Sequence, residues 1–270
     1  MADLPLFVTA GPIRDRALGM IWGAACGARA ADGLSSSWPD SDDMLTHLSE
    51  SLLDREVFDP SDLMRRLIRS WCERAGRPQL VDPATTRPDA KAFVAGLIPI
   101  SILRRGRQRM AQKEASELAT AFQAGSAEGE ALEVMTLFLR RALLGLTRED
   151  VLDPFDWEGD PRVGRVTSGK SLPIETHRDL VAAVDQTRGL AMRRIPIAAA
   201  FTALASVHAS DAAFVLGGAL IGAFDGAGAF VSDPHLDRRG TPSARLEHLV
   251  DRLLAVRPPA GHDVQREVFS

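Results

Sequence analysis

Apolar side chains recur along this chain every three or four residues, which is the spacing of amphipathic helices, and few stretches alternate as a strand does. After the polar run Asp40 to Asp43, for example, Met44, Leu48 and Leu52 fall on one helical face. We therefore predict an all-α protein. The predicted helices cover residues 14–29, 44–53, 60–75, 90–103, 114–124, 128–146, 177–184, 191–205, 211–224 and 243–256.

Two segments interrupt the helical pattern. Residues 78–88 are rich in proline and are predicted to form a loop, and Leu152 to Ser171 carries prolines and glycines that predict a long irregular segment. No repeat, low-complexity block or linker divides the chain. We expect one helical domain over residues 1–257 and a polar tail at 258–270.

Composition limits the classes of function. The chain has 270 residues, 45% of them hydrophobic, and a net charge of −4, which gives no reason to expect nucleic acid as a partner. Cys26 and Cys72 lie in apolar helical stretches and are expected to be buried thiols rather than a disulfide or a zinc site. Lysine occurs only at positions 91, 113 and 170 among many arginines, as in high-GC bacterial genes.

The apolar stretches are too short for a membrane protein. The longest uncharged one, Ala212 to Phe224, falls short of the roughly 20 residues that a spanning helix needs. The first 14 residues lack the basic and apolar regions of a signal peptide. We expect a soluble cytoplasmic protein that binds no membrane.

One motif matches a nucleotide-binding loop. Gly164 to Ser171 reads G-x-x-x-x-G-K-S, a pattern whose backbone amides cradle phosphates between a buried strand and a helix. The preceding residues Asp156 to Val163 are too polar for a central strand, and Pro173 follows where the helix should continue. The sequence favours a flexible polar loop, and phosphate binding there stays open.

Two ends of the sequence resemble the ADP-ribosylglycohydrolases. Arg16 to Gly27 is similar to the first helix of that family, and Ser41 to Leu53 and Phe58 to Arg66 continue it. Ala209 to Gly226 resembles the family's closing Asp-x-Asp-Thr motif with its helix of small residues. The resemblance implies a compact orthogonal bundle of helices.

The resemblance also implies a magnesium site. In the family, a Thr-Asp-Asp motif and the late motif hold two magnesium ions, which suits a hard cation that prefers oxygen ligands. Its ligand positions correspond here to Ser41, Asp42, Asp43 and Asp211. Expected partners of these groups are replaced by residues without side-chain oxygen: Ala28, Ala209, Ala212 and, in the mid-chain substrate motif that maps onto 91–96, Gly96.

Four oxygen donors with added waters suit one magnesium ion rather than two. Asp43 and His208 are the candidate catalytic groups. Each feature also has a structural alternative, because Asp42, Asp43 and Asp211 are typical capping residues of helix starts. The basic run Arg104 to Arg109 either grips phosphate or forms a solvated helix end.

The functional expectation follows the resemblance. It is magnesium-assisted hydrolysis, or binding, of an ADP-ribose-type glycosidic ligand at a partly degenerate site, with an ADP-ribose-like small molecule or an ADP-ribosylated protein as partner. The alternative is a catalytically inactive pseudoenzyme that acts as an interaction protein. An altered enzyme for another nucleoside or glycoside is a third possibility.

Overall fold

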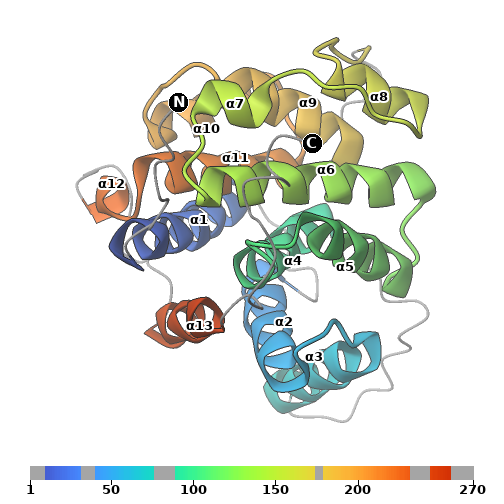
Figure 1. Cartoon of the computed structure of the whole chain (residues 1–270), viewed down its shortest axis with the longest axis vertical. Coiled ribbons are helices and arrows are strands. Elements are labelled where there is room, and N and C mark those ends of the chain that lie inside the picture. The colour runs from blue at the N-terminus through green and yellow to red at the C-terminus, as the bar shows by residue number, and fades with distance from the viewer. Residues whose placement is uncertain (1–9, 32–39, 76–88, 174–178, 232–243, 257–270) are drawn as a thin grey trace, which may run out of the picture.

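The computed structural model describes residues 10–31, 40–75, 89–173, 179–231 and 244–256, and this part of the chain is helical without a strand (Figure 1). The all-α prediction is therefore confirmed. The helices are α1 (Ala10–Ala31), α2 (Ser41–Arg55), α3 (Pro60–Ala75), α4 (Ala90–Leu103), α5 (Gln108–Ala121), α6 (Ser126–Leu143), α7 (Arg148–Leu152), α8 (Pro161–Thr167), α9 (Leu180–Ala191), α10 (Ile197–Ser206), α11 (Asp211–Asp225), α12 (Gly228–Val231) and α13 (Ala244–Ala255).

Helices α6 and α11 cross the middle of the molecule in Figure 1, with α7 to α10 on one side and α1 to α5 and α13 on the other. Helix α4 is apolar all round, and every residue from Lys91 to Leu103 is buried. It packs against α1, α2, α5, α6, α11 and α13. An apolar helix with no polar face has to lie inside a bundle, so α4 forms the centre of the core.

Helices α1 and α11 form an antiparallel pair in which the backbones touch. Gly19 faces Gly222, and Gly23 faces Gly218 one turn further along. Gly27 then packs on the backbone of Phe214, so the last turns of α1 lie beside the first turn of α11. Glycines four residues apart fall on one helical face, and this spacing lets the two helices approach closely.

Helices α2 and α4 pack against each other, and their contacts follow in the same order along both helices. A Cβ atom at Gly96 would lie 3.1 Å from Cγ of Met44 and 3.4 Å from Cδ2 of Leu48, so these residues face each other mid-helix. At the carboxyl ends, the Arg104 guanidinium donates to the carbonyl oxygen of Glu56 at 2.5 Å. The first turns of α2 and α4 therefore lie at the same end of the pair, which we call the amino-terminal pole (residues 40–43 and 89–92).

The prediction of an irregular segment at 152–171 is wrong in part. Pro161 begins α8, and Asp160 caps that helix by accepting from the amide of Arg162 at 2.8 Å. Proline fits the first turn of a helix because the amide that it lacks would have no partner there. The short helix α7 is likewise absent from the prediction, and α5 begins six residues before the predicted 114.

Several expectations lie outside the described residues, among them the loop at 78–88 and the tail at 258–270. A single domain over residues 1–257 therefore stays a prediction. None of the helices in the described ranges is long and apolar enough to cross a membrane. Cys26 and Cys72 form no disulfide with each other, and both are partly buried rather than fully buried as predicted.

Candidate functional site

Three of the predicted metal ligands begin helix α2. Asp40 caps this helix and accepts from the Asp43 amide at 2.8 Å, while the Asp43 carboxylate accepts from the Asp40 amide at 3.4 Å. This reciprocal pair is a capping box, so Asp43 has the structural role that its place in the sequence suggested. Asp43 is buried and Asp42 is exposed.

Ser41 differs from its neighbours in having an unused polar group. Its side chain is 3% exposed, and its hydroxyl oxygen has no hydrogen-bond partner among the described residues. A buried hydroxyl without a partner costs free energy, because the water that it lost on folding is not replaced. Such a group at the start of α2 is suited to contact a bound ion, water or ligand.

Asp211, the fourth predicted ligand, is the first residue of α11 and is exposed. Ser210 before it donates from its backbone amide to the side-chain oxygen of Gln186 at 3.1 Å. Since Gly27 packs on Phe214, Asp211 lies near the carboxyl end of α1. Ala212 and Ala28, the replaced family positions, are both buried.

The donor set does not form a carboxylate cluster. Within the described ranges, no three His, Cys, Asp or Glu side chains are grouped as metal ligands. A two-metal centre shared by bridging carboxylates is therefore absent from this part of the chain. Two of the three predicted carboxylates, with the Ser41 hydroxyl and waters, would still match what one magnesium ion takes from a protein, so the single-ion site stays a prediction.

His208, the second catalytic candidate, lies where α10 ends. Its φ angle is +50°, its backbone amide donates to the Ala205 carbonyl at 3.1 Å, and its side chain is exposed. The next amide, of Ala209, donates back to Leu204 at 3.1 Å. These two bonds close the last turn of α10, so the backbone of His208 terminates a helix. A catalytic role for its side chain stays a prediction.

Lys91 also belongs to the amino-terminal pole, and the sequence indicated it only as the first residue of the stretch 91–96 that matches the family's substrate motif. It lies in the first turn of α4 and is 3% exposed, and its ammonium nitrogen is 3.6 Å from the Asp89 carboxylate. The sequence did carry a signal for it. Lys91 is the only charged residue in the otherwise apolar stretch 90–103, where solvation cannot explain a charge.

A polar cleft of about 380 Å³ lies beside the pole, between α2, α3 and the start of α13. Glu50 is its most connected residue, with His47 at 3.6 Å, Arg66 at 3.7 Å and an ion pair to Arg245. Burial lowers the pKa of His47 below its usual value, although the Glu50 and Asp43 carboxylates oppose that shift. The cleft is lined by Asp42, Asp43, Thr46, His47, Glu50, Arg66, Arg69, Ser70, Glu73 and Arg245.

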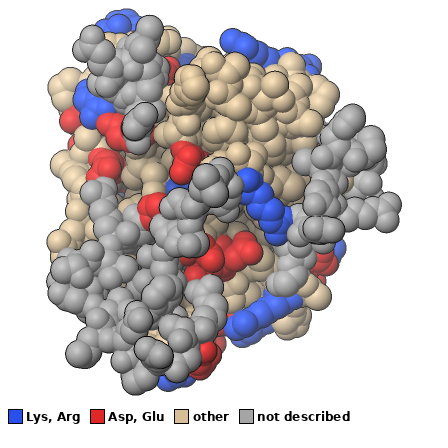
Figure 2. All heavy atoms as spheres, turned by 180° about the vertical axis from the view of Figure 1, so that it is seen from behind, with Lys and Arg blue, Asp and Glu red and all other residues tan. Residues whose placement is uncertain are grey.

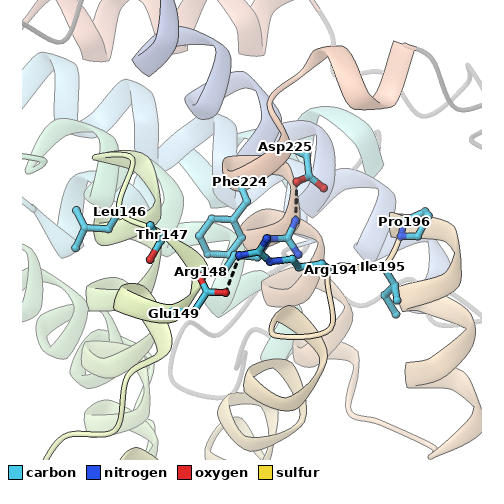
Figure 3. A pocket seen from close by; sticks show the side chains of 9 residues that line it. All are labelled: Leu146, Thr147, Arg148, Glu149, Arg194, Ile195, Pro196, Phe224 and Asp225. Atoms are coloured by element: carbon cyan, nitrogen blue, oxygen red, sulfur yellow. Dashed lines mark hydrogen bonds and ion pairs between the residues drawn. The ribbon is translucent and has the colours of Figure 1, made fainter.

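A second pocket, of about 520 Å³, lies at the other end of α11 (Figure 3). The Arg148 guanidinium lies 5.0 Å from the centre of the Phe224 ring and donates to Asp225 at 2.5 Å, and Arg194 pairs with Glu149 at 2.7 Å. Asp225 is fourteen residues from Asp211, about 21 Å along the helix. This pocket is therefore separate from the predicted site, and its charges neutralise each other.

The Gly164 to Ser171 motif is not a nucleotide loop. The amide of Gly169 donates to the carbonyl of Val166 at 3.0 Å, and the amide of Lys170 donates to the carbonyl of Arg165 at 3.0 Å. These bonds end α8, whereas a nucleotide loop requires a helix that begins at the lysine. The sequence pattern is present, but the backbone amides of Gly169 and Lys170 already donate to carbonyl oxygens of α8.

In the basic run Arg104 to Arg109, the first two side chains form hydrogen bonds within the protein. Arg104 is buried and pairs with Glu114 at 2.7 and 2.9 Å. Arg105 donates to the carbonyl oxygen of Leu254, in the last turn of α13, at 2.9 Å and to that of Val256, just after the helix, at 3.0 Å. Both alternatives predicted for this run, a phosphate-binding cluster and a solvated helix end, are therefore wrong for Arg104 and Arg105.

Charge on the molecular surface is mixed. On the face shown in Figure 2, acidic and basic side chains lie next to one another, with red and blue groups adjoining near its centre. A nucleic-acid-binding protein typically presents a broad basic face instead. The described part of this face presents no such surface.

No protein-family model matches the sequence, and no curated protein matches it. The fold does have solved counterparts. A structure titled "ADP-ribosylglycohydrolase-related protein complex" is similar with a TM-score of 0.64 and 24% sequence identity, over 90% of this chain and 98% of the other. The resemblance to the ADP-ribosylglycohydrolases that the two ends of the sequence indicate is thereby confirmed at the level of the fold.

Proposed function

We propose that this protein binds an ADP-ribose-type glycosidic ligand at the amino-terminal pole, with one magnesium ion. The observation that carries the proposal is the buried, unpartnered hydroxyl of Ser41 beside the carboxylates of Asp42 and Asp43. In the family that these residues resemble, the corresponding Thr-Asp-Asp motif holds magnesium. The first turns of α2 and α4 add backbone amides that favour anionic ligand groups.

The four positions that match the family motif, Ser41, Asp42, Asp43 and Asp211, are the candidate ligands; the hydroxyl and two of the carboxylates would hold the ion, with waters completing its coordination. A bound magnesium ion would orient ribose hydroxyls and polarise water near the glycosidic carbon. Asp43 is the candidate base for that water. The capping box orients its carboxylate, because one of its oxygens accepts from the Asp40 amide.

Binding is favoured over efficient turnover. Ala209 and Ala212 replace an acid and a hydroxyl of the late family motif, and the three predicted carboxylates do not form one cluster of ligands in the described part of the chain. A missing carboxylate removes both charge and a group that orients water. This observation also favours the second candidate, an inactive pseudoenzyme that binds a protein partner.

Thermal unfolding with magnesium and ADP-ribose tests the proposal. A ligand at a hundredfold excess over its Kd stabilises a fold by about 2.7 kcal/mol, which corresponds to a Tm increase of about 5–10 °C at this size. We expect such an increase with both additives together. Asp42→Asn and Asp211→Asn should each remove most of it, whereas Asp156→Asn on the exposed segment before α8 should not.

The same proteins distinguish the three outcomes. Release of ADP-ribose from an ADP-ribosylated arginine peptide, lost in Asp43→Asn, would show weak hydrolysis. A ligand-induced Tm increase without release would show a binder. An unchanged Tm with either additive, in a protein that unfolds cooperatively, would contradict the proposal and leave the interaction protein as the function.

A further inference from the structure

Helix α8 and the residues that follow it form a groove of about 600 Å³. In Figure 1 this helix lies at the opposite end of the molecule from α2 and α3. Pro161 and Gly164 of α8 line the groove together with Leu172 and Pro173, and most of its exposed lining is carbon. Gly164 has no side chain to fill the hollow. A concave apolar surface of this kind is typical of a site that binds a partner or a ligand.

Hydrogen bonds to α9 hold the groove in shape. The Arg188 guanidinium of α9 donates to the carbonyl oxygens of Val166 at 2.6 Å and of Thr167 at 3.1 Å. The Leu172 amide donates to the Asp185 carboxylate of the same helix at 2.9 Å. Helix α8 and the segment after it are therefore both fixed to α9. A preformed site loses less conformational entropy on binding than one that has to become ordered.

The charged residues that line the groove are all basic. They are Arg162, Arg165 and Lys170. Arg162 also pairs with Asp179, whereas Arg165 and Lys170 form no ion pair with the part of the chain that the structure describes. The polar cleft and the second pocket, by contrast, have carboxylates among their arginines. The groove therefore attracts negative charge, although the net charge of the whole chain is −4.

We propose that this groove is a docking site for a partner protein, which inserts a short acidic segment with apolar side chains. The apolar walls bury those side chains, and Arg165 and Lys170 bind the carboxylates of the segment. The seven residues of α8 span about 10 Å, a length that three or four extended residues cover. This inference does not rest on the proposed function, because the amino-terminal pole belongs to α2 and α4.

Two other anionic ligands fit the groove less well. A nucleotide phosphate would need free backbone amides in the 164–171 motif, and those of Gly169 and Lys170 already donate to carbonyl oxygens of α8. A bilayer surface is flat, so it does not fill a hollow of this volume, whereas an apolar side chain does. A peptide segment is therefore the occupant that the shape and the charge of the groove favour.

The test begins with selection from a displayed library of short random peptides, with the full-length wild type as bait. We expect the enriched peptides to combine Asp or Glu with apolar residues. Fluorescence polarisation of one enriched, labelled peptide then gives its Kd. Arg165→Glu/Lys170→Glu should raise this Kd at least about tenfold, because two attractions become repulsions. If the double variant does not fold, Lys170→Glu replaces it, since Lys170 is exposed.

Arg109→Glu/Arg252→Glu is the matched control. It changes the net charge by the same amount, at exposed positions of α5 and α13 on the other side of the molecule, and should bind the peptide as the wild type does. Arg165→Lys/Lys170→Arg keeps both charges and should also bind as the wild type does. Replacement of the acidic residues of the peptide by their amides should weaken binding as the double reversal does.

The outcomes separate the possible occupants. Enrichment of no peptide, or of peptides without acidic residues, would overturn the proposal, and so would equal Kd values for Arg165→Glu/Lys170→Glu and its control. Binding to phosphatidylserine vesicles that only this variant abolishes would assign the groove to a membrane surface instead. A wild-type dimer that the same variant dissociates would make a second copy of the chain the occupant. ADP-ribose binding is measured separately, so failure of the proposed function leaves this result unaffected.

Discussion

Gly23 of α1 and Gly218 of α11 face each other so closely that neither position has room for a side chain. A Cβ atom at Gly218 would lie 2.7 Å from the carbonyl carbon of Gly23, and one at Gly23 would overlap the carbonyl oxygen of Gly218. Gly19 and Gly222 repeat the arrangement one turn away. The pair α1–α11 is therefore fixed by backbone contact, which also sets where Asp211 lies.

Gly218→Ala should destabilise the fold strongly. The added methyl group meets backbone rather than a movable side chain, so the helices have to separate, at a cost of about 3 kcal/mol or more. Urea unfolding measures the change in the free energy of unfolding. Gly189→Ala is the matched control, because a Cβ atom at this exposed helical position meets nothing within 4 Å. It should stabilise the protein by up to about 1 kcal/mol, and equal effects of the two changes would contradict the close approach.

Glu114→Gln should also destabilise the fold strongly. Glu114 on α5 accepts two hydrogen bonds from Arg104, at 2.7 and 2.9 Å, and both side chains are buried. Removing one charge leaves the other buried without its partner, which costs about 3–5 kcal/mol. Glu117→Gln, one turn along the same helix, breaks only the exposed pair with Lys113 and should cost less than about 1 kcal/mol. Denaturant unfolding of both variants makes the comparison, and a small effect of Glu114→Gln would show that the buried pair is dispensable.

The motif at 164–171 should be inert toward nucleotides. The amides of Gly169 and Lys170 already donate within the end of α8, so they cannot cradle a phosphate. We expect Mg-ATP and Mg-GTP to leave the Tm of the wild type unchanged, as measured by differential scanning fluorimetry. Gly169→Ala should nevertheless lower stability by about 1 kcal/mol, because its φ of +82° disfavours a side chain. A nucleotide-induced increase that Lys170→Ala removes would contradict this view.

Local signals in the sequence predicted much of the fold. The predicted helix 90–103 agrees with α4 at both ends, because Asp89 caps its start and the apolar run sets its length. The start of α8 shows the limit of such signals. A proline read as a helix breaker is, after the cap Asp160, the first residue of a helix.

The candidate site was predicted only as a set of residue types. The sequence indicated that Asp43 is either a ligand or a capping residue, and the structure shows that it belongs to a capping box. The place of Lys91 depends on the register of α2 against α4, and the fate of Arg105 depends on carbonyls of α13 about 150 residues later. Contacts this distant in the chain are set by packing, which no local pattern records.

Asp62 should make stability depend on pH. Burial alone would raise the pKa of this carboxyl, but hydrogen bonds from Arg66 at 2.6 Å and Arg55 at 3.2 Å outweigh it and lower the pKa to about 2. A carboxyl whose pKa is lower in the folded state than in the unfolded state stabilises the fold above its unfolded pKa. That stabilisation is lost as the pH falls through the folded pKa. Asp62 should contribute about 2 kcal/mol at pH 7, and this contribution should fall from about pH 4 and be mostly gone near pH 2.

Comparison of Asp62→Asn with the wild type isolates this contribution from that of other carboxyls. The difference in the free energy of unfolding should be about 2 kcal/mol at neutral pH and less than about 1 kcal/mol near pH 2.5. Asp54→Asn is the control, since Asp54 binds the same Arg66 at 2.8 Å but its side chain is 51% exposed. Water screens that exposed pair, so its loss should change stability by less than about 1 kcal/mol at either pH. A difference for Asp62→Asn that stays constant from pH 7 to 2.5 would mean that Arg55 and Arg66 do not hold the Asp62 carboxylate ionised.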